Sequence, residues 1–177
     1  MIYSTDPPEI LIYRAQRGLR RARRVFDALM GGMLLLLALP ILIVASLAIL
    51  IEDGRPVFFL QRRTGRFERL FTIYKLRTMR RHDCADQLKP RSSADPRLTR
   101  VGRILRKTSI DELPQLLNVV RGDMSLIGPR PEMPFVVRGY ENWQHLRHLV
   151  TPGVTCIWQT EKRSTISLER PEATALD

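Results

Sequence analysis

The sequence predicts an α-rich α+β protein attached to a membrane by one proline-bent helix, with a small β-hairpin and amphipathic helices. Three observations support this fold class. An uncharged apolar run of 24 residues covers Ala28–Ile51. Two β-prone stretches flank a Thr64-Gly65 turn, and short helical patterns follow them. The length of 177 residues leaves room for one domain with a moderate core and one appendage.

The composition is strongly basic, with 29 Lys and Arg against 18 Asp and Glu and a net charge of +11. This excess implies an anionic partner: nucleic acid, an acidic membrane surface or a phosphorylated substrate. Cys84 and Cys156 have no metal-ligand spacing, so the sequence predicts neither a zinc site nor a disulfide framework. Glycine-rich phosphate-loop motifs are absent, so Arg, Lys or a metal would have to hold any phosphate.

The apolar run is long enough to reach across a hydrocarbon core of about 30 Å at about 1.5 Å per residue. It is too long for a signal-peptide core of about 7–15 residues. A buried helix of a soluble protein is disfavoured because the run has no polar face. We therefore divide the chain into a basic segment (1–24), a membrane helix (25–52) and a cytoplasmic domain (53–177).

Both flanks of the membrane helix are rich in arginine, from Arg14 to Arg24 before it and from Arg55 to Arg69 after it. Arginine-rich flanks mark the cytoplasmic side, so a straight span would put one cluster on the wrong side. Pro40, in the middle of the run, removes a backbone donor and bends a helix. We therefore expect a re-entrant helix that enters and leaves by one leaflet, beside anionic lipids, rather than a spanning helix.

The β-prone stretches after the helix are Val57–Gln61 and Leu70–Leu76, which predict a hairpin. Alternation along the second stretch puts Lys75 and Arg77 on one face, where they could act together on an anion. The alternative is an ordinary solvated strand face. Residues 80–100 are polar, contain two prolines and lack periodicity, which predicts a mobile loop.

Two adjacent carboxylates, Asp111 and Glu112, stand in "TSIDELPQLLNVVRGDMSLIGPRP". Ser109 and Glu112 fit a capping box, whereas Asp111 as the N-cap would place the following proline in the first turn, and the register stays open. A helix over Glu112–Val120 is expected, with Gly122 as its C-cap. The local motif leaves open whether the acidic pair only caps this helix or also performs chemistry.

Arg130 stands between two prolines in Gly128-Pro129-Arg130-Pro131. The prolines lock the backbone on both sides, so the guanidinium is presented with little freedom and with a fork that suits a phosphate. An exposed arginine on a structural turn is the alternative. Residues Pro134–Leu149 form a broadly amphipathic segment suited to an interface.

Several motifs together identify a resemblance. "RRVFD", "PVFFLQRRTG", "FTIYKLRTM", "VGRILRKTSIDELPQLLNVVRGDMSLIGPRPE" and "PGVTCIWQ" occur in this order. This order resembles the monotopic phosphoglycosyltransferase superfamily, the bacterial sugar transferases, from about Arg24 to Gln159. The resemblance implies a catalytic domain on the cytoplasmic face of a bacterial inner membrane. The implied enzyme moves a sugar-1-phosphate from a UDP-sugar to a polyprenol phosphate such as undecaprenyl phosphate and releases UMP. This would be the first membrane step of exopolysaccharide, capsule, O-antigen or glycoprotein glycan synthesis.

The resemblance also implies roles for single residues. Asp111 would attack the β-phosphate and form a phosphosugar intermediate, with Glu112 in support and Mg²⁺, or Mn²⁺, bound at Asp111. The resemblance implies phosphate binding by Arg130, Arg106, Lys75 and Arg163, and the strand face shared with Lys75 adds Arg77. Partners would be the UDP-sugar, the polyprenol phosphate and anionic lipids, with no nucleic acid and with a homodimer left open.

Two other functions remain as alternatives. The chain could be a membrane-tethered basic binding module without catalysis. It could also be a truncated, inactive partner of another transferase, since the sequence stops at Asp177 before further amphipathic segments expected from the resemblance. Release of UMP from a UDP-sugar would separate the enzyme from both.

Overall fold

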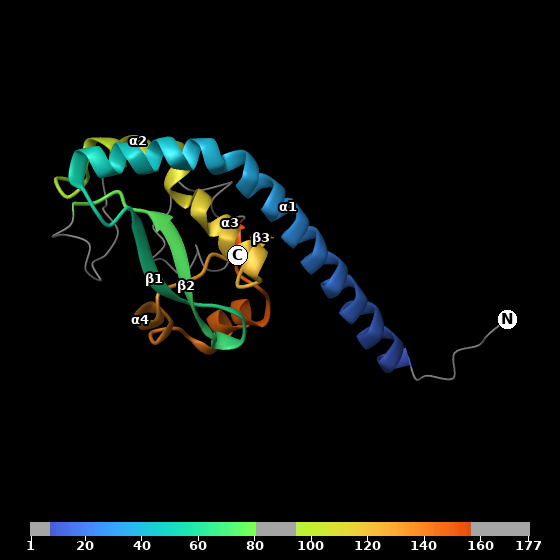
Figure 1. Cartoon of the computed structure of the whole chain (residues 1–177). Helices are drawn as coiled ribbons and strands as arrows, with labels where there is room; N and C mark the ends of the chain where they lie inside the picture. The colour runs from blue at the N-terminus through green and yellow to red at the C-terminus, as the bar shows by residue number, and fades with distance from the viewer. Residues whose placement is uncertain (1–7, 81–94, 157–177) are drawn as a thin grey trace.

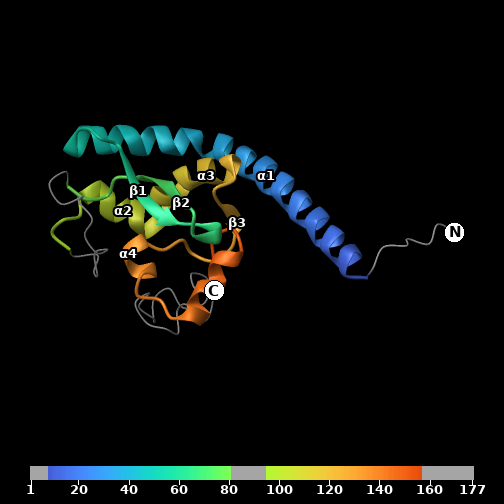
Figure 2. The same cartoon turned by 90° about the horizontal axis from the view of Figure 1, so that it is seen from below.

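The structure is a computed structural model that describes residues 8–80 and 95–156, with side chains from residue 18 onward. Its first element, α1 (Pro8–Asp53), is one helix of 46 residues that contains Pro40. Figures 1 and 2 show that α1 changes direction along its length and projects beyond the rest of the chain at its N-terminal end. The part Gly18–Asp53 is long and apolar enough to cross a membrane.

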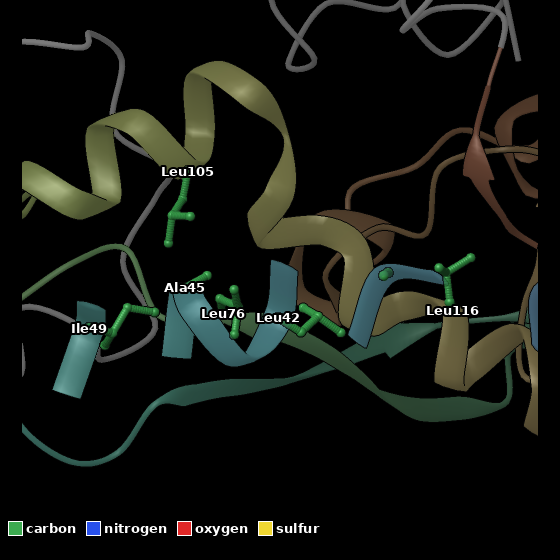
Figure 3. Packing of buried hydrophobic residues seen from close by; sticks show 7 residues of the cluster. Leu42, Ala45, Ile49, Leu76, Leu105 and Leu116 are labelled. Carbon is green, nitrogen blue, oxygen red and sulfur yellow. The ribbon is translucent and has the colours of Figure 1, made fainter. Parts of the chain in front are cut away.

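The second half of α1 has two different faces. Ala38, Leu42, Ala45 and Ile49 recur at helical spacing and are buried. They pack in one core cluster with Leu76, Leu105 and Leu116 (Figure 3). The other face carries large side chains that are 67–86% exposed, Leu36 at 68%, Leu37 at 67%, Val44 at 67% and Ile51 at 86%. The helix therefore lies along the domain with one face and leaves an apolar face uncovered.

A hairpin follows α1. It consists of β1 (Phe58–Thr64) and β2 (Leu70–Leu76), which pair antiparallel from Phe58↔Leu76 to Thr64↔Leu70 and are joined by η1 (Arg66–Glu68). The second strand has the bounds that the sequence predicts. The first extends beyond Gln61 because the ladder continues to the Thr64↔Leu70 pair, so the turn begins at Gly65.

α2 (Arg100–Thr108) is fastened at its N-terminus to the end of α1. The Glu52 carboxylate accepts hydrogen bonds from the backbone N–H groups of Arg100 and Val101, at 2.7 and 2.8 Å. A negative side chain at this position also favours the positive end of the helix dipole. Gly102 lets α2 approach the chain that leaves β2, because a Cβ there would lie 2.0 Å from the carbonyl oxygen of Thr78.

The predicted helix Glu112–Val120 is two elements, the 3-10 helix η3 (Ile110–Gln115) and α3 (Leu116–Arg121). Pro114 has no N–H to donate, and the regular α-helix begins only after it. Ser109 caps α2 in the left-handed region, and its side chain makes no capping hydrogen bond to η3. Neither of the two registers that the sequence left open is found, because Ser109 forms no capping box and Asp111 lies inside η3, whereas the predicted C-cap at Gly122, with φ of 94°, is confirmed.

The last described elements are β3 (Ser125–Ile127), α4 (Pro134–Val137), η4 (Asn142–Leu149) and β4 (Gly153–Thr155). β3 and β4 pair in parallel, which the sequence did not predict because three-residue strands show no usable alternation. The predicted amphipathic segment Pro134–Leu149 is divided into α4 and η4.

Charged residues near the start of the apolar run tie α1 to these elements. The Asp27 carboxylate accepts hydrogen bonds from Ser125 Oγ at 2.7 Å and from the Leu126 N–H at 3.2 Å. The Arg24 guanidinium donates to the carbonyl oxygens of Val119 and Val120, at 2.8 and 2.6 Å. Arg24 thus binds the negative end of α3 and serves the fold.

The observed architecture agrees with the predicted mixed, helix-rich class with one long apolar helix near the N-terminus. Re-entrant insertion and the three-part division of the chain stay predictions. Residues 81–94 of the predicted mobile loop lie outside the described residues.

Candidate active site

Two cationic side chains from distant parts of the chain meet at the carboxylate of Glu112. Its Oε1 accepts hydrogen bonds from Lys75 Nζ at 2.9 Å and from Arg130 Nη2 at 3.2 Å. The exposed fractions of these side chains are 13% for Lys75, 16% for Glu112 and 12% for Arg130. β2 supplies the lysine, η3 the carboxylate and the segment after β3 the arginine. One carboxylate oxygen is therefore shared by two largely buried cations.

Asp111 lies beside this group and differs from Glu112 in its partners. It is buried, and no salt bridge within 4.0 Å reaches it from the residues that the structure describes. Burial raises the pKa of Asp111, and the neighbouring Glu112 charge raises it further, whereas Lys75 and Arg106 act in the opposite direction. Asp111 is thus a buried carboxyl that interacts electrostatically with Lys75 and Arg106, although Lys75 is hydrogen-bonded to Glu112 and not to Asp111.

Arg106 approaches Asp111 from α2. Its Nε donates to Thr78 Oγ1 at 2.8 Å, which orients the side chain. Burial lowers the pKa of Arg106, and the negative charge of Asp111 works against that shift. The cation is therefore electrostatically coupled to Asp111.

The two cations on Glu112 respond differently to their surroundings. Burial lowers the pKa of Lys75, although Glu112 opposes the shift. Burial also disfavours the charge of Arg130, but Glu112 and Glu132 outweigh it and raise the pKa of the guanidinium. The Glu112 carboxylate therefore stabilises both positive charges in a place where water is scarce.

Two further residues expected to bind phosphate do not join this group. Arg77 forms a salt bridge to Asp53 at 3.1 Å and donates to the carbonyl oxygens of Asp53 and Gly54, at 3.0 and 2.7 Å. It lies just past the end of β2 and binds the C-terminus of α1, so it does not point with Lys75 at one anion. Arg163 lies outside the described residues.

An apolar groove of about 440 Å³ runs between α1 and α2. Pro40 belongs to its lining, together with Ile41, Val44, Ala45, Ala48, Val101, Ile104, Leu105 and Ile110. Ile110 directly precedes Asp111, and Leu105 directly precedes Arg106. Two lining residues of the groove are thus the sequence neighbours of Asp111 and Arg106, and others, Ile41 and Val44, belong to the exposed face of α1.

The charged group has few oxygen ligands for a metal ion. No cluster of three or more His, Cys, Asp or Glu side chains occurs among residues 18–80 and 95–156. Mg²⁺ needs only one or two protein carboxylates when waters and substrate phosphates complete its shell. Asp111 fits that requirement, whereas Oε1 of Glu112 is already bonded to two cations.

Arg63, which the sequence did not predict as a site residue, lies on β1 and is 4% exposed. Its Nη2 donates to Gln61 Oε1 at 2.7 Å, and its Nη1 lies 3.8 Å from a carboxylate oxygen of Glu132. Burial lowers the pKa of Arg63 to about 10. The alternation of Gln61 and Arg63 on one strand face was a signal that could have found this pair.

The arrangement combines a buried carboxylate with several fixed cations. A carboxylate can attack phosphorus, and cations that are already oriented stabilise the charge on phosphoryl oxygens without reorganisation during the reaction. This chemistry suits transfer of a phosphorylated group in two displacements.

Known proteins similar to this chain are transferases of sugar phosphates or sugars, which agrees with this chemistry. A sequence model of the family described as "Bacterial sugar transferase" matches residues 19–177. An uncharacterised sugar transferase of Bacillus subtilis is 43% identical over 150 residues, which cover 84% of this chain and 72% of that protein. An undecaprenyl-phosphate glucose phosphotransferase of Komagataeibacter xylinus is 43% identical over 140 residues, 75% of this chain and 26% of that protein.

A third relative is an undecaprenyl-phosphate galactose phosphotransferase of Salmonella typhimurium. It is 33% identical over 195 residues, which cover 95% of this chain and 40% of that protein. The chain thus spans less than half the length of this relative and of the Komagataeibacter protein. The long apolar helix, in a family of this kind, indicates membrane association. The extent of these matches shows that the chain belongs to the bacterial sugar transferase family.

Proposed function

We propose that this chain transfers a sugar-1-phosphate from a UDP-sugar to a polyprenol phosphate at the cytoplasmic face of a bacterial inner membrane. The observation that carries the proposal is the contrast between the two adjacent carboxylates. Glu112 is bonded to Lys75 and Arg130, whereas Asp111 is buried beside the same cations without a salt bridge from any described residue. Asp111 is therefore the carboxylate available to react.

The proposed reaction has two displacements at one phosphorus atom. A carboxylate oxygen of Asp111 attacks the β-phosphorus of the UDP-sugar, the bond to the bridging oxygen breaks, and UMP leaves. A phosphate oxygen of the polyprenol phosphate then attacks the same phosphorus and displaces Asp111. Lys75, Arg106 and Arg130 neutralise the phosphoryl oxygens during both steps.

Asp111 can act as a nucleophile only in its ionised form. Burial and Glu112 raise its pKa, so the attacking oxygen is more basic than that of an exposed aspartate. Lys75 and Arg106 limit this increase and keep the ionised form accessible. The cations thus help to ionise the nucleophile as well as to bind the substrate.

A divalent cation is part of the proposal. Mg²⁺, or Mn²⁺ in its place, would be held by Asp111 together with phosphate oxygens of the substrate, and it would neutralise charge on the diphosphate. Chelation should therefore abolish transfer, and readdition of Mg²⁺ should restore it. Full activity in a chelator would remove the metal from the proposal.

The lipid acceptor is supported by the groove between α1 and α2. Its lining is apolar and includes Ile110, the residue before Asp111. A polyisoprenyl chain in this groove would place its terminal phosphate near Arg106 and Asp111. The names of the relatives from Komagataeibacter and Salmonella, which specify undecaprenyl phosphate, support the same class of acceptor.

Re-entrant insertion is supported by how α1 packs. Its inner face contacts the domain at Asp27 and again from Ala38 to Ile49, so much of its apolar length is not available to a bilayer on all sides. A helix perpendicular to the membrane and surrounded by lipid would have to give up these contacts. Cysteine tags at Leu19 and Arg69, in a chain otherwise without cysteine, should both be protected from a periplasmic reagent; labelling of either would favour a span.

The decisive experiment is UMP release from a panel of UDP-sugars with undecaprenyl phosphate and Mg²⁺. We expect acceptor-dependent turnover with at least one sugar, and a burst of UMP no larger than the amount of enzyme when acceptor is omitted. Mass spectrometry of the quenched enzyme should locate a phosphosugar on the peptide that contains Asp111. A membrane-tethered binding module or an inactive partner would release no UMP from any of the donors.

A further inference from the structure

The segment Pro129–Glu132 carries Arg130 and belongs to no helix or strand, apart from an isolated bridge between Glu132 and Thr64, and each of its four carbonyl oxygens accepts a hydrogen bond. The donors to residues 129, 130, 131 and 132 are, in order, Gly153 N at 2.9 Å, Arg147 Nη2 at 3.1 Å, Arg63 Nη1 at 3.3 Å and Thr64 N at 2.9 Å. These donors come from β4, η4 and β1. Three separate elements therefore hold four consecutive peptide groups.

The backbone of residues 129–132 needs these outside donors for a physical reason. Pro129 and Pro131 have no N–H, so the segment cannot join a hydrogen-bonded ladder on its own. Carbonyl oxygens that are buried without a partner would also be costly. The two backbone donors hold the outer carbonyls, and two arginine side chains hold the carbonyls of Arg130 and Pro131 themselves.

The two arginines are in turn oriented by other residues. Arg147 Nη1 donates to the hydroxyl oxygen of Tyr140 at 3.2 Å. Arg63 donates to Gln61 and faces the carboxylate of Glu132, which belongs to the same segment. Each arginine therefore connects a fixed side chain to the backbone that carries Arg130.

We propose that Arg63 and Arg147 are positioning residues that fix Arg130 for a phosphate group by bonding the two carbonyls that follow its Cα, those of Pro131 and of Arg130 itself. This inference rests on the proposed function, in which Arg130 binds phosphoryl oxygens of the substrate. A guanidinium fork recognises phosphate through direction as well as charge, so small rotations of its backbone reduce the interaction. Neither arginine needs to touch the substrate for this role.

The burial of Arg63 supports a role beyond packing. Its Nε is buried and has no hydrogen-bond partner, so the side chain is held at a cost in solvation. An apolar side chain of similar size would fill this space without that cost. What an apolar side chain could not supply is the donor to the carbonyl of Pro131.

The test is a double-mutant cycle between Arg147 and Arg130. Arg147 is chosen over Arg63 because it is only half-buried, so its replacement should destabilise the fold less. Arg147→Gln should lower kcat/KM for the UDP-sugar by about tenfold to a hundredfold, since misplacement by about 1 Å can cost that much. Arg147→Lys keeps a donor and should recover part of the loss. In the Arg130→Lys background, Arg147→Gln should lower kcat/KM by less than about threefold, because the guanidinium fork that Arg147 positions is no longer present.

Arg66 supplies the matched control. Its Nε donates to the carbonyl oxygen of Leu149 at 3.2 Å, so it also bonds backbone at η4 but does not contact residues 129–132. Arg66→Gln should leave kcat/KM within about twofold, as expected for a surface change. Equal losses for Arg147→Gln in both Arg130 backgrounds, or a loss in Arg66→Gln as large as in Arg147→Gln, would overturn the proposal.

Binding of UDP separates this inference from the proposed reaction. It is measured for the wild type, Arg147→Gln, Arg130→Lys and the double variant. If the wild type releases no UMP, the transferase function fails, but UDP affinity still reports the cycle: Arg147→Gln should weaken binding only when Arg130 is present. Equal weakening in both backgrounds, or none in either, would reject the positioning role. Circular dichroism of Arg63→Gln and Arg147→Gln identifies any variant that has lost its fold, and the cycle is then read with Arg147→Lys.

Discussion

The outer face of α1 and the charged group around Glu112 reverse the usual distribution of residues in a water-soluble protein. α1 exposes large apolar side chains such as Leu37 and Ile51, at 67% and 86%. The other region buries Lys75, Arg130 and Glu112, whose side chains are at most 16% exposed. Exposed apolar surface of this kind indicates contact with lipid or another apolar partner, and buried charges generally require partners.

The two regions differ in whether the described part of the chain supplies a partner. The outer face of α1 is exposed among the described residues, so lipid or another apolar partner would have to cover it. The cations at the site already have a partner in Glu112. Their charge is therefore compensated within the chain, and in the proposed mechanism Asp111 stays available for reaction.

The largest expected effect is on Asp111, which tests whether the buried group is catalytic. Asp111→Asn should reduce UMP release at least about a thousandfold, which corresponds to roughly 4 kcal/mol of barrier. The melting temperature should not fall, because the folded pKa of Asp111 is raised and its ionised form therefore opposes folding. This opposition is absent below the unfolded pKa and is complete above the folded pKa, so the variant should gain relative stability as pH rises. A lower melting temperature at pH 8 would contradict the raised pKa of Asp111, and unchanged UMP release would contradict its catalytic role.

The second effect tests whether the direction of the cation matters as well as its charge. Arg130→Lys keeps a positive charge beside Glu112 but loses the planar fork, so kcat/KM should fall by about tenfold to a hundredfold. Arg121→Lys is the control, because Arg121 is exposed and donates to the hydroxyl of Tyr74. Its activity should stay close to that of the wild type. An Arg130→Lys enzyme with full activity would remove Arg130 from the phosphate site.

The third effect concerns the two faces of α1. Leu37→Asp puts a charge on the outer face, which should weaken membrane association by about 2.5–3.5 kcal/mol if the residue lies deep in lipid. Leu42→Ala on the inner face should instead lower the free energy of unfolding by about 2–5 kcal/mol and leave membrane association in place. Membrane flotation and thermal unfolding in detergent measure the two quantities. The same response from both variants would mean that the faces are not distinct.

The smallest effect is a pair of shifts in the acid limb of the profile of kcat/KM against pH. Glu112→Gln removes a charge that raises the pKa of Asp111, so its limb should move to lower pH. Lys75→Met removes a charge that lowers this pKa, so its limb should move to higher pH. Both variants will also be slower, but only the direction of the shift is diagnostic. Shifts in the same direction would show that the limb does not report Asp111.

The features that could be predicted from the sequence are those with a local cause. The apolar run fixes a long helix because its 24 residues contain no charge. The hairpin follows from two β-prone stretches around Gly65, and Gly122 ends α3 because glycine accepts a φ of 94°. The family could be recognised because several motifs stand in one order along the chain.

Other features depended on contacts between distant residues. The meeting of Lys75, Glu112 and Arg130 joins three separate elements, whereas strand alternation alone grouped Lys75 with Arg77. The strand ends at Leu76, and Arg77 is bound by the carbonyls at the end of α1. The register of the helix start stayed open for a similar reason, since only the structure shows that Ser109 already ends α2.

By itself, the sequence determined that a long apolar helix, a hairpin and an acidic pair would form, because hydrophobicity, turn preference and proline geometry act within a few residues. Only the tertiary structure decided which charges would share a buried space. Glu112 became the partner of two cations and Asp111 did not, because neighbouring residues on η3 point in different directions and only one can reach both Lys75 and Arg130. Residues such as Arg63, Arg147 and Asp27 gained their roles in the same way, since each bonds a backbone or side-chain group that is brought near only by folding.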